Sequence, residues 1–177
     1  IAPDLARTYR VILIDNRGSG QTRAPLRVVH RVSAMAEDIG AVLDAAGEQS
    51  AHLVGFSMGG MIAQQFSVDH PARVRSLSLF GTHVGTPWAV QAPSRVRTLL
   101  FEKSQMAPEE SLRAMRPYTY AAQTPDRLFE EDAVVRLANM PSARDYQAQL
   151  YALIYWSVYL RLPALRTPCL VMHGLQD

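Results

Sequence analysis

Gly55-Phe-Ser-Met-Gly-Gly60 decides the fold, because it has the form Gly-x-Ser-x-Gly and lies between a predicted strand and a predicted helix. The strand covers residues 51–55 and the helix residues 58–69. A serine in this place sits on a tight turn, where bulky side chains two residues away on either side would clash. We therefore predict that Ser57 is a nucleophile. The N–H of Met58, at the start of the helix, is the predicted donor to an oxyanion.

The region around this motif alternates strand and helix signals. Short apolar runs predict strands over residues 9–15 and 74–80, in addition to residues 51–55. Apolar side chains between Met35 and Ala46 recur at helical spacing, with Ser33 as the expected N-cap and Gly47 as the stop. Strands separated by single helices form βαβ units, so we expect an α/β fold whose parallel sheet is buried on both faces.

The second half of the sequence changes character. Four helices are predicted, over residues 94–106, 108–116, 125–139 and 142–160, before a strand pattern returns at 169–173. An insertion of about 80 residues inside a sheet indicates a functional lid rather than a structureless loop. The expected organisation is a first core part (1–83), a helical lid (84–163) and a second core part (164–177).

Four blocks in this order resemble the lid-bearing α/β-hydrolases of the esterase, enol-lactonase and cofactor-free haloperoxidase group. The blocks are the loop 15–22, the motif segment 51–63, the segment 69–79 and the strand segment 168–177. The resemblance covers about residues 1–83 and 163–177, and it implies a parallel-sheet α/β-hydrolase core.

The resemblance also implies the catalytic acid. Asp177 follows the strand 169–173, where the family usually places the carboxylate that orients the catalytic histidine. Some relatives carry this acid one strand earlier, but Gly81-Thr-His-Val-Gly85 contains no carboxylate. Asp15 also follows a predicted strand, and the family's loop at that place is mostly structural.

The catalytic histidine has no candidate in the expected place. The chain order of this fold is serine, acid, histidine, and all five histidines precede Asp177. The family's second oxyanion donor lies in a loop that would precede residue 1. We therefore expect both ends of the domain to be missing from this sequence.

The reaction expected from the resemblance is hydrolysis of a carboxylic ester or lactone through an acyl-enzyme. Serine at position 57 argues against dehalogenases and epoxide hydrolases, which use a carboxylate nucleophile. A small, mostly apolar acyl substrate is expected, because the predicted lid is rich in aromatic side chains. Tyr151, Tyr155 and Tyr159 are predicted to share one helical face, although such stripes more often serve packing. The candidate pocket residues are Phe56, His83, Trp88, Tyr155 and Trp156.

Three alternatives remain open at this point. The same catalytic residues would also serve perhydrolysis with peroxide, as in a cofactor-free haloperoxidase. A second alternative is a hydrolase-like protein that binds a ligand without catalysis, since fold does not fix function. A third is a complete but inactive chain that lacks a general base.

Composition narrows the remaining classes. Hydrophobic residues make up 48% and charged residues 19%, which is typical of a folded globular protein. The 17 arginines and one lysine are scattered, so nucleic acid is not an expected partner. The longest apolar stretch, 150–160, is too short for a bilayer, and we expect a cytoplasmic protein without a membrane partner. Cys169 is predicted to be a buried structural thiol. No metal or organic cofactor is expected, and the oligomeric state stays open.

Overall fold

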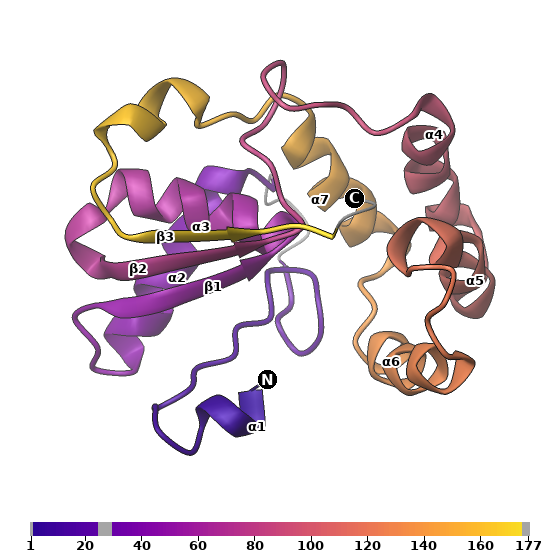
Figure 1. Ribbon diagram of the computed structural model, residues 1–177, viewed down its shortest axis with the longest axis horizontal. Helices are drawn as coiled ribbons and strands as arrows, with labels where there is room; N and C mark the ends of the chain where they lie inside the picture. Colours follow the sequence, from indigo (N-terminus) through magenta and orange to yellow (C-terminus); the bar gives the residue numbers. More distant parts are fainter. Residues whose placement is uncertain (1, 25–29, 175–177) are drawn as a thin grey trace.

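The computed structural model describes residues 2–24 and 30–174, and its centre is a three-stranded parallel sheet (Figure 1). The strands are β1 (Ala51–Phe56), β2 (Val74–Phe80) and β3 (Cys169–Met172), in the order β1-β2-β3. Leu53 pairs with Leu77, and Leu79 pairs with Val171. The predicted α/β fold with parallel strands is therefore confirmed.

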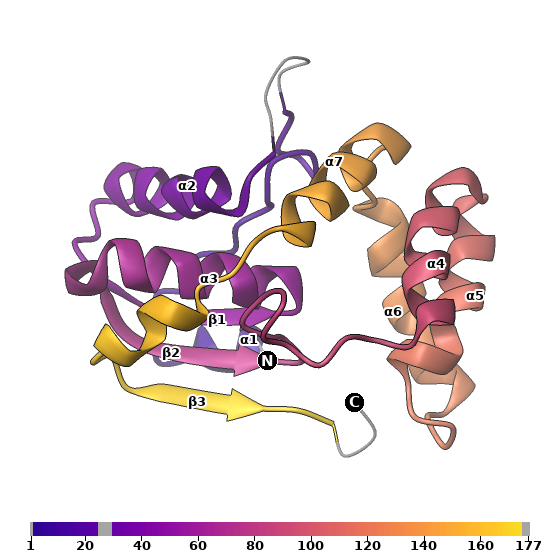
Figure 2. The same cartoon turned by 90° about the horizontal axis from the view of Figure 1, so that it is seen from above.

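Two helices cover one side of this sheet, as the two views show together (Figures 1 and 2). They are α2 (Val32–Ala45) and α3 (Met58–Asp69), and a short 3-10 turn, η1 (Pro71–Arg73), leads from α3 into β2. The apolar spacing of α2 buries its inner face against Phe66 of α3, which is fully buried. Gly47 ends α2 as predicted, with φ at +73°. Ser33 is not the N-cap, because the helix already begins at Val32.

The opposite face of the sheet is uncovered among the described residues. Val54 and Phe56 are 61% and 66% exposed, and Leu170 and Met172 on β3 are 51% and 45% exposed. The prediction of burial on both faces is therefore wrong for this part of the chain, because α2 and α3 lie on the same side. Cys169 is exposed as well, contrary to the prediction of a buried thiol. It lies on the outer strand, whereas α3 packs on β1 and β2.

The predicted strand over residues 9–15 does not form. A short helix, α1 (Ala2–Leu5), precedes this segment, which has no strand pairing in the structure. Ile12 and Ile14 nevertheless pack against the core cluster of α2 and α3. The apolar pattern therefore indicates burial only in part, since Tyr9 and Leu13 are 57% and 79% exposed. A strand also needs a neighbour that completes its ladder of hydrogen bonds.

A helical insertion separates β2 from β3, as predicted. It contains α4 (Ser94–Glu102), α5 (Pro108–Thr119), α6 (Asp126–Ala138) and α7 (Ala143–Ile154). The 3-10 turn η2 (Lys103–Gln105) joins α4 to α5, and η3 (Tyr159–Ala164) leads towards β3. Figures 1 and 2 place α4, α5 and α6 together, beside the sheet rather than on its covered face.

The last predicted helix is too long, because α7 ends at Ile154 and not near residue 160. The chain turns there so that Ser157 forms an antiparallel bridge with Gly85. Tyr151, Tyr155 and Tyr159 therefore do not share one helical face. Residues 84–86 lead into the insertion and residues 154–158 lead out of it. These two segments pair with each other, and we call them the neck.

Candidate active site

Ser57 occupies the turn between β1 and α3, at the carboxyl end of a parallel sheet where open α/β folds bind ligands. Its φ is +50° and its ψ is −121°, a conformation that L residues adopt only when their surroundings impose it. The surroundings here are hydrogen bonds. The Ser57 N–H donates to the Phe80 carbonyl at 3.0 Å, and the Thr82 hydroxyl donates to the Ser57 carbonyl at 2.7 Å. The turn is thereby held against the end of β2.

Close contacts with neighbouring atoms explain two of the glycines of the motif. A Cβ atom on Gly55 would lie 2.6 Å from the Gly59 carbonyl oxygen and the Gly60 Cα. A Cβ atom on Gly60 would lie 2.6 Å from the Thr82 side chain. A Cβ atom on Gly59 would meet nothing within 4 Å. The sequence-based argument therefore holds for Gly55 but is wrong for Gly59, and Gly60 is the second glycine that the packing requires.

The electrostatics of this turn favour negative charge. Met58 is the first residue of α3, and the first N–H groups of a helix have no partner within the helix. The helix dipole adds partial positive charge at the same end. The first turn of α3 contains no acidic residue, and Ser57 is exposed. An anion that develops on a group bound to Ser57 would therefore be stabilised from the Met58 side.

His83 lies beside this turn, directly after Thr82. Its carbonyl accepts a hydrogen bond from the buried Gln64 amide at 3.0 Å, and its Nδ1 accepts the Gly85 N–H at 3.0 Å. Acceptance at Nδ1 leaves the proton of the neutral ring on Nε2. Partial burial lowers the pKa of His83, which favours this neutral form. Thr82 and Gln64 were not predicted from the sequence, because a hydroxyl after a strand and an amide in a helix carry no distinctive pattern.

We expect the titration of His83 to reduce stability in mild acid. The pKa of His83 is lower in the folded protein than its unfolded value of about 6.5, so the unfolded chain takes up the proton first as the pH falls. The contribution of His83 to folding stability is therefore intact above pH ~6.5 and is lost progressively below it. Urea unfolding at pH 7.5, 6.5 and 5.5 should show a shallower loss in His83→Gln than in the parent. Equal losses would contradict this assignment.

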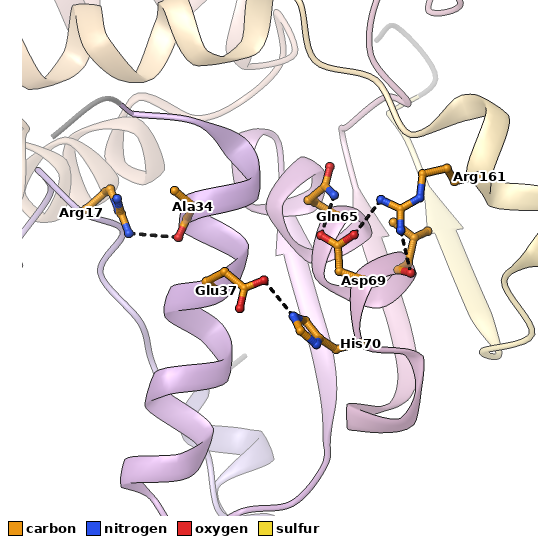
Figure 3. A network of polar contacts seen from close by, with 8 residues as sticks. Arg17, Ala34, Glu37, Gln65, Asp69, His70 and Arg161 are labelled. Carbon is orange, nitrogen blue, oxygen red and sulfur yellow. Dashed lines mark hydrogen bonds and ion pairs between the residues drawn. The ribbon is translucent and has the colours of Figure 1, made fainter.

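Trp156, a predicted pocket residue, lies in the hydrophobic core and is 8% exposed. Its indole N–H donates to the Gln65 side-chain oxygen at 2.8 Å. The Gln65 amide in turn donates to Asp69, which also pairs with Arg161 at 2.6 Å. Figure 3 shows the Gln65 and Arg161 side chains both directed at the Asp69 carboxylate. This network ties the neck and η3 to α3, the helix that begins directly after Ser57.

The other predicted pocket residues lie on the surface of the described chain. Phe56 and Tyr155 are 66% and 93% exposed. Trp88 is 52% exposed, and its ring stacks on Tyr159 with centroids 4.6 Å apart. A cavity of about 530 Å³ lies between α4 and α5, and none of these residues lines it.

Of the two candidate carboxylates, the structure describes only that of Asp15. Asp177 lies outside the described residues. The Asp15 carboxylate accepts the Gln21 N–H at 2.9 Å, which fits a structural role in its loop. Among the described residues, the Ser57 N–H donates to Phe80, and the Ser57 carbonyl accepts from Thr82, Gly60 and Met61. None of these partners is a histidine.

Residues 2–24 and 30–174 contain neither a candidate metal site nor a helix that could span a membrane. In these residues, no group of three or more His, Cys, Asp or Glu side chains could hold a metal ion. Across the same described ranges, every helix is too short or too polar to cross a bilayer.

The chain belongs to the alpha/beta hydrolase fold family, whose profile matches residues 1–177. The resemblance indicated by the four sequence blocks is thereby confirmed. The chain is 29% identical over 176 residues to RutD of Variovorax paradoxus, a protein named provisionally as a carbamate hydrolase. It is also 33% identical over 177 residues to the 2-hydroxy-6-oxononadienedioate/2-hydroxy-6-oxononatrienedioate hydrolase of Burkholderia vietnamiensis.

Both matches cover 96% of this chain, but only 64% and 60% of those two proteins. The chain therefore spans less than two thirds of the length of these relatives. Among solved structures, an esterase from Exiguobacterium antarcticum is similar, with a TM-score of 0.78 and 26% identity. That similarity covers 92% of this chain and 62% of the esterase.

Proposed function

We propose that the protein is a serine hydrolase that cleaves a carboxylic ester or a lactone through an acyl-enzyme on Ser57. The observation that carries this proposal is the conformation of Ser57, which is exposed at positive φ with the N-terminus of α3 beside it. A strained serine in this place has no evident packing role, since its side chain is not buried. Family membership and the hydrolase names of the relatives support the same class.

The proposed reaction follows the order of bond changes in acyl transfer. The Ser57 Oγ bonds to the substrate carbonyl carbon while its proton passes to a histidine, and the Met58 N–H holds the oxyanion. Collapse of this intermediate expels the alcohol, which takes the proton. A water molecule then attacks the acyl-enzyme in the same way and releases the carboxylic acid. Asp177 is the proposed partner of the histidine, which in this fold follows the acid along the chain, so we assign none of the five present to this role.

The helical insertion is the proposed lid over this site. It is joined to the core by the neck, which begins two residues after Thr82 and therefore close to Ser57. His83 lies between the two, and Phe56 directly precedes the nucleophile. Phe56, His83, Trp88 and Tyr155 are the proposed substrate contacts, and their mostly apolar character favours a small apolar acyl group.

A rapid-mixing assay with p-nitrophenyl butyrate tests the proposed function. The expected result is a burst of p-nitrophenol, about one per active site, followed by a slower steady rate that reports deacylation. A short lactone and a carbamate belong in the same panel, because a provisional carbamate hydrolase is among the relatives. Halide oxidation in peroxide and acetate, without ester turnover, would indicate perhydrolysis instead. Retention of ligand without any turnover would indicate a binding protein.

A further inference from the structure

The helical insertion has a small interior of its own, distinct from the candidate active site. Phe129 and Ala133 of α6 are 3% and 8% exposed, and Ser111 of α5 is 2% exposed. The turn η2 lies against α5 and contributes Lys103 to the same interior. A cavity of about 50 Å³ lies between these elements. A single buried water needs about 10–15 Å³, so this cavity has room for a molecule of a few heavy atoms.

The hydroxyl groups on the cavity wall already donate hydrogen bonds to other protein groups. The Ser111 hydroxyl donates to the Pro108 carbonyl at 2.8 Å, and the Thr119 hydroxyl donates to the Met115 carbonyl at 3.0 Å. The Tyr120 hydroxyl donates to the Asp132 carboxylate. The other wall residues with side-chain donors are Lys103, with its ammonium, and Arg136, with its guanidinium.

Among the described residues, a single carboxylate, that of Asp132, pairs with these two cations. Asp132 accepts the Nε–H of Arg136 at 2.5 Å, and it also accepts the Tyr120 hydroxyl. Within the described residues, no carboxylate forms an ion pair with Lys103, whose Nζ lies 4.3 Å from the centre of the Tyr146 ring. Burial and the charge of Arg136 lower the pKa of Lys103. The cavity wall therefore has an excess positive charge that one monoanion would neutralise.

We infer that this cavity binds a small carboxylate anion, held between Lys103 and Arg136. Arg136 has N–H groups left after its bond to Asp132, and a planar carboxylate fits their geometry. The remaining wall includes Leu112, Met115 and Phe129, which suits a short alkyl group on the anion. This mixed wall favours a short-chain carboxylate over an inorganic dianion such as phosphate.

Acetate is the probe that tests this site, and Ser57→Ala is the protein form in which to use it, so that catalysis plays no part. At constant ionic strength, acetate should raise the unfolding midpoint saturably, whereas chloride should not. Lys103→Met keeps a linear apolar stem and removes the charge, so acetate binding should weaken at least tenfold. Arg113→Met is the matched control, because it removes a charge on the exposed surface of α5 and should leave acetate binding unchanged.

A second measurement works even if Lys103→Met does not fold. Lys103 is the only lysine of this sequence, so selective ¹⁵N labelling of lysine gives one side-chain ammonium signal for it in NMR spectra. Acetate should shift this signal saturably and raise the pKa of Lys103, because the anion stabilises the charged form. An unchanged signal and no saturable stabilisation would overturn the inference, as would equal acetate binding in Lys103→Met. Equal stabilisation by chloride would replace a carboxylate site with a simple halide site.

Discussion

Replacing Ser57 with alanine should lower turnover of a p-nitrophenyl ester by about 10⁴-fold or more, because no other group on the turn can form the acyl-enzyme. Stability should change little, since alanine keeps the backbone bonds to Phe80 and Thr82 and also keeps the strain of positive φ. Steady-state kinetics together with urea unfolding separate these two effects.

A serine inside α3, the helix that follows Ser57, provides the control for this substitution. Ser67 is fully buried in α3 and its hydroxyl donates to the Ala63 carbonyl at 2.7 Å, away from the turn. Ser67→Ala should leave turnover within about twofold while it lowers stability by about 1 kcal/mol. Near-parent turnover in Ser57→Ala would remove Ser57 from the mechanism, whatever the control does.

Gly55→Ala should destabilise the fold by about 2 kcal/mol or more, because its new methyl group would meet backbone atoms rather than a flexible side chain. Gly59→Ala, four residues away in the same motif, should be neutral or stabilising by up to about 1 kcal/mol. Its position is open, and alanine is the better helix former. Urea midpoints of the two variants, measured side by side, check the contrast. Equal destabilisation of both would contradict the packing described for the turn.

The elements around Ser57 could be predicted from the sequence because their determinants are local. A glycine-bounded serine fixes the start of α3, Pro71 fixes its end, and the apolar run after it fixes β2. The end of α7 was not predictable in this way, because the pairing of Ser157 with Gly85 joins residues far apart in the sequence. The segment 9–15 shows the same limit, since Ile12 and Ile14 pack against the core but no neighbouring strand pairs with the segment.

The same difference between local and long-range determinants applies to the candidate site. Ser57 and the helix N-terminus beside it follow from one motif. The positions of Thr82 and Gln64 do not, because they depend on how the end of β2 meets α3. Trp156 was predicted as a pocket residue from its aromatic character, whereas its bond to Gln65 places it in the core. An aromatic residue in a helical insertion thus cannot be assigned to pocket or core until its neighbours are known.

The most direct test of the central claim is covalent labelling of the protein with a fluorophosphonate, which reacts with activated serine nucleophiles. Intact mass should rise by one phosphonyl group per chain, and peptide mapping should place that group on Ser57. Ser57→Ala should take up none. A label on another serine, or an unlabelled protein that still hydrolyses esters, would contradict the assignment of Ser57 as the nucleophile.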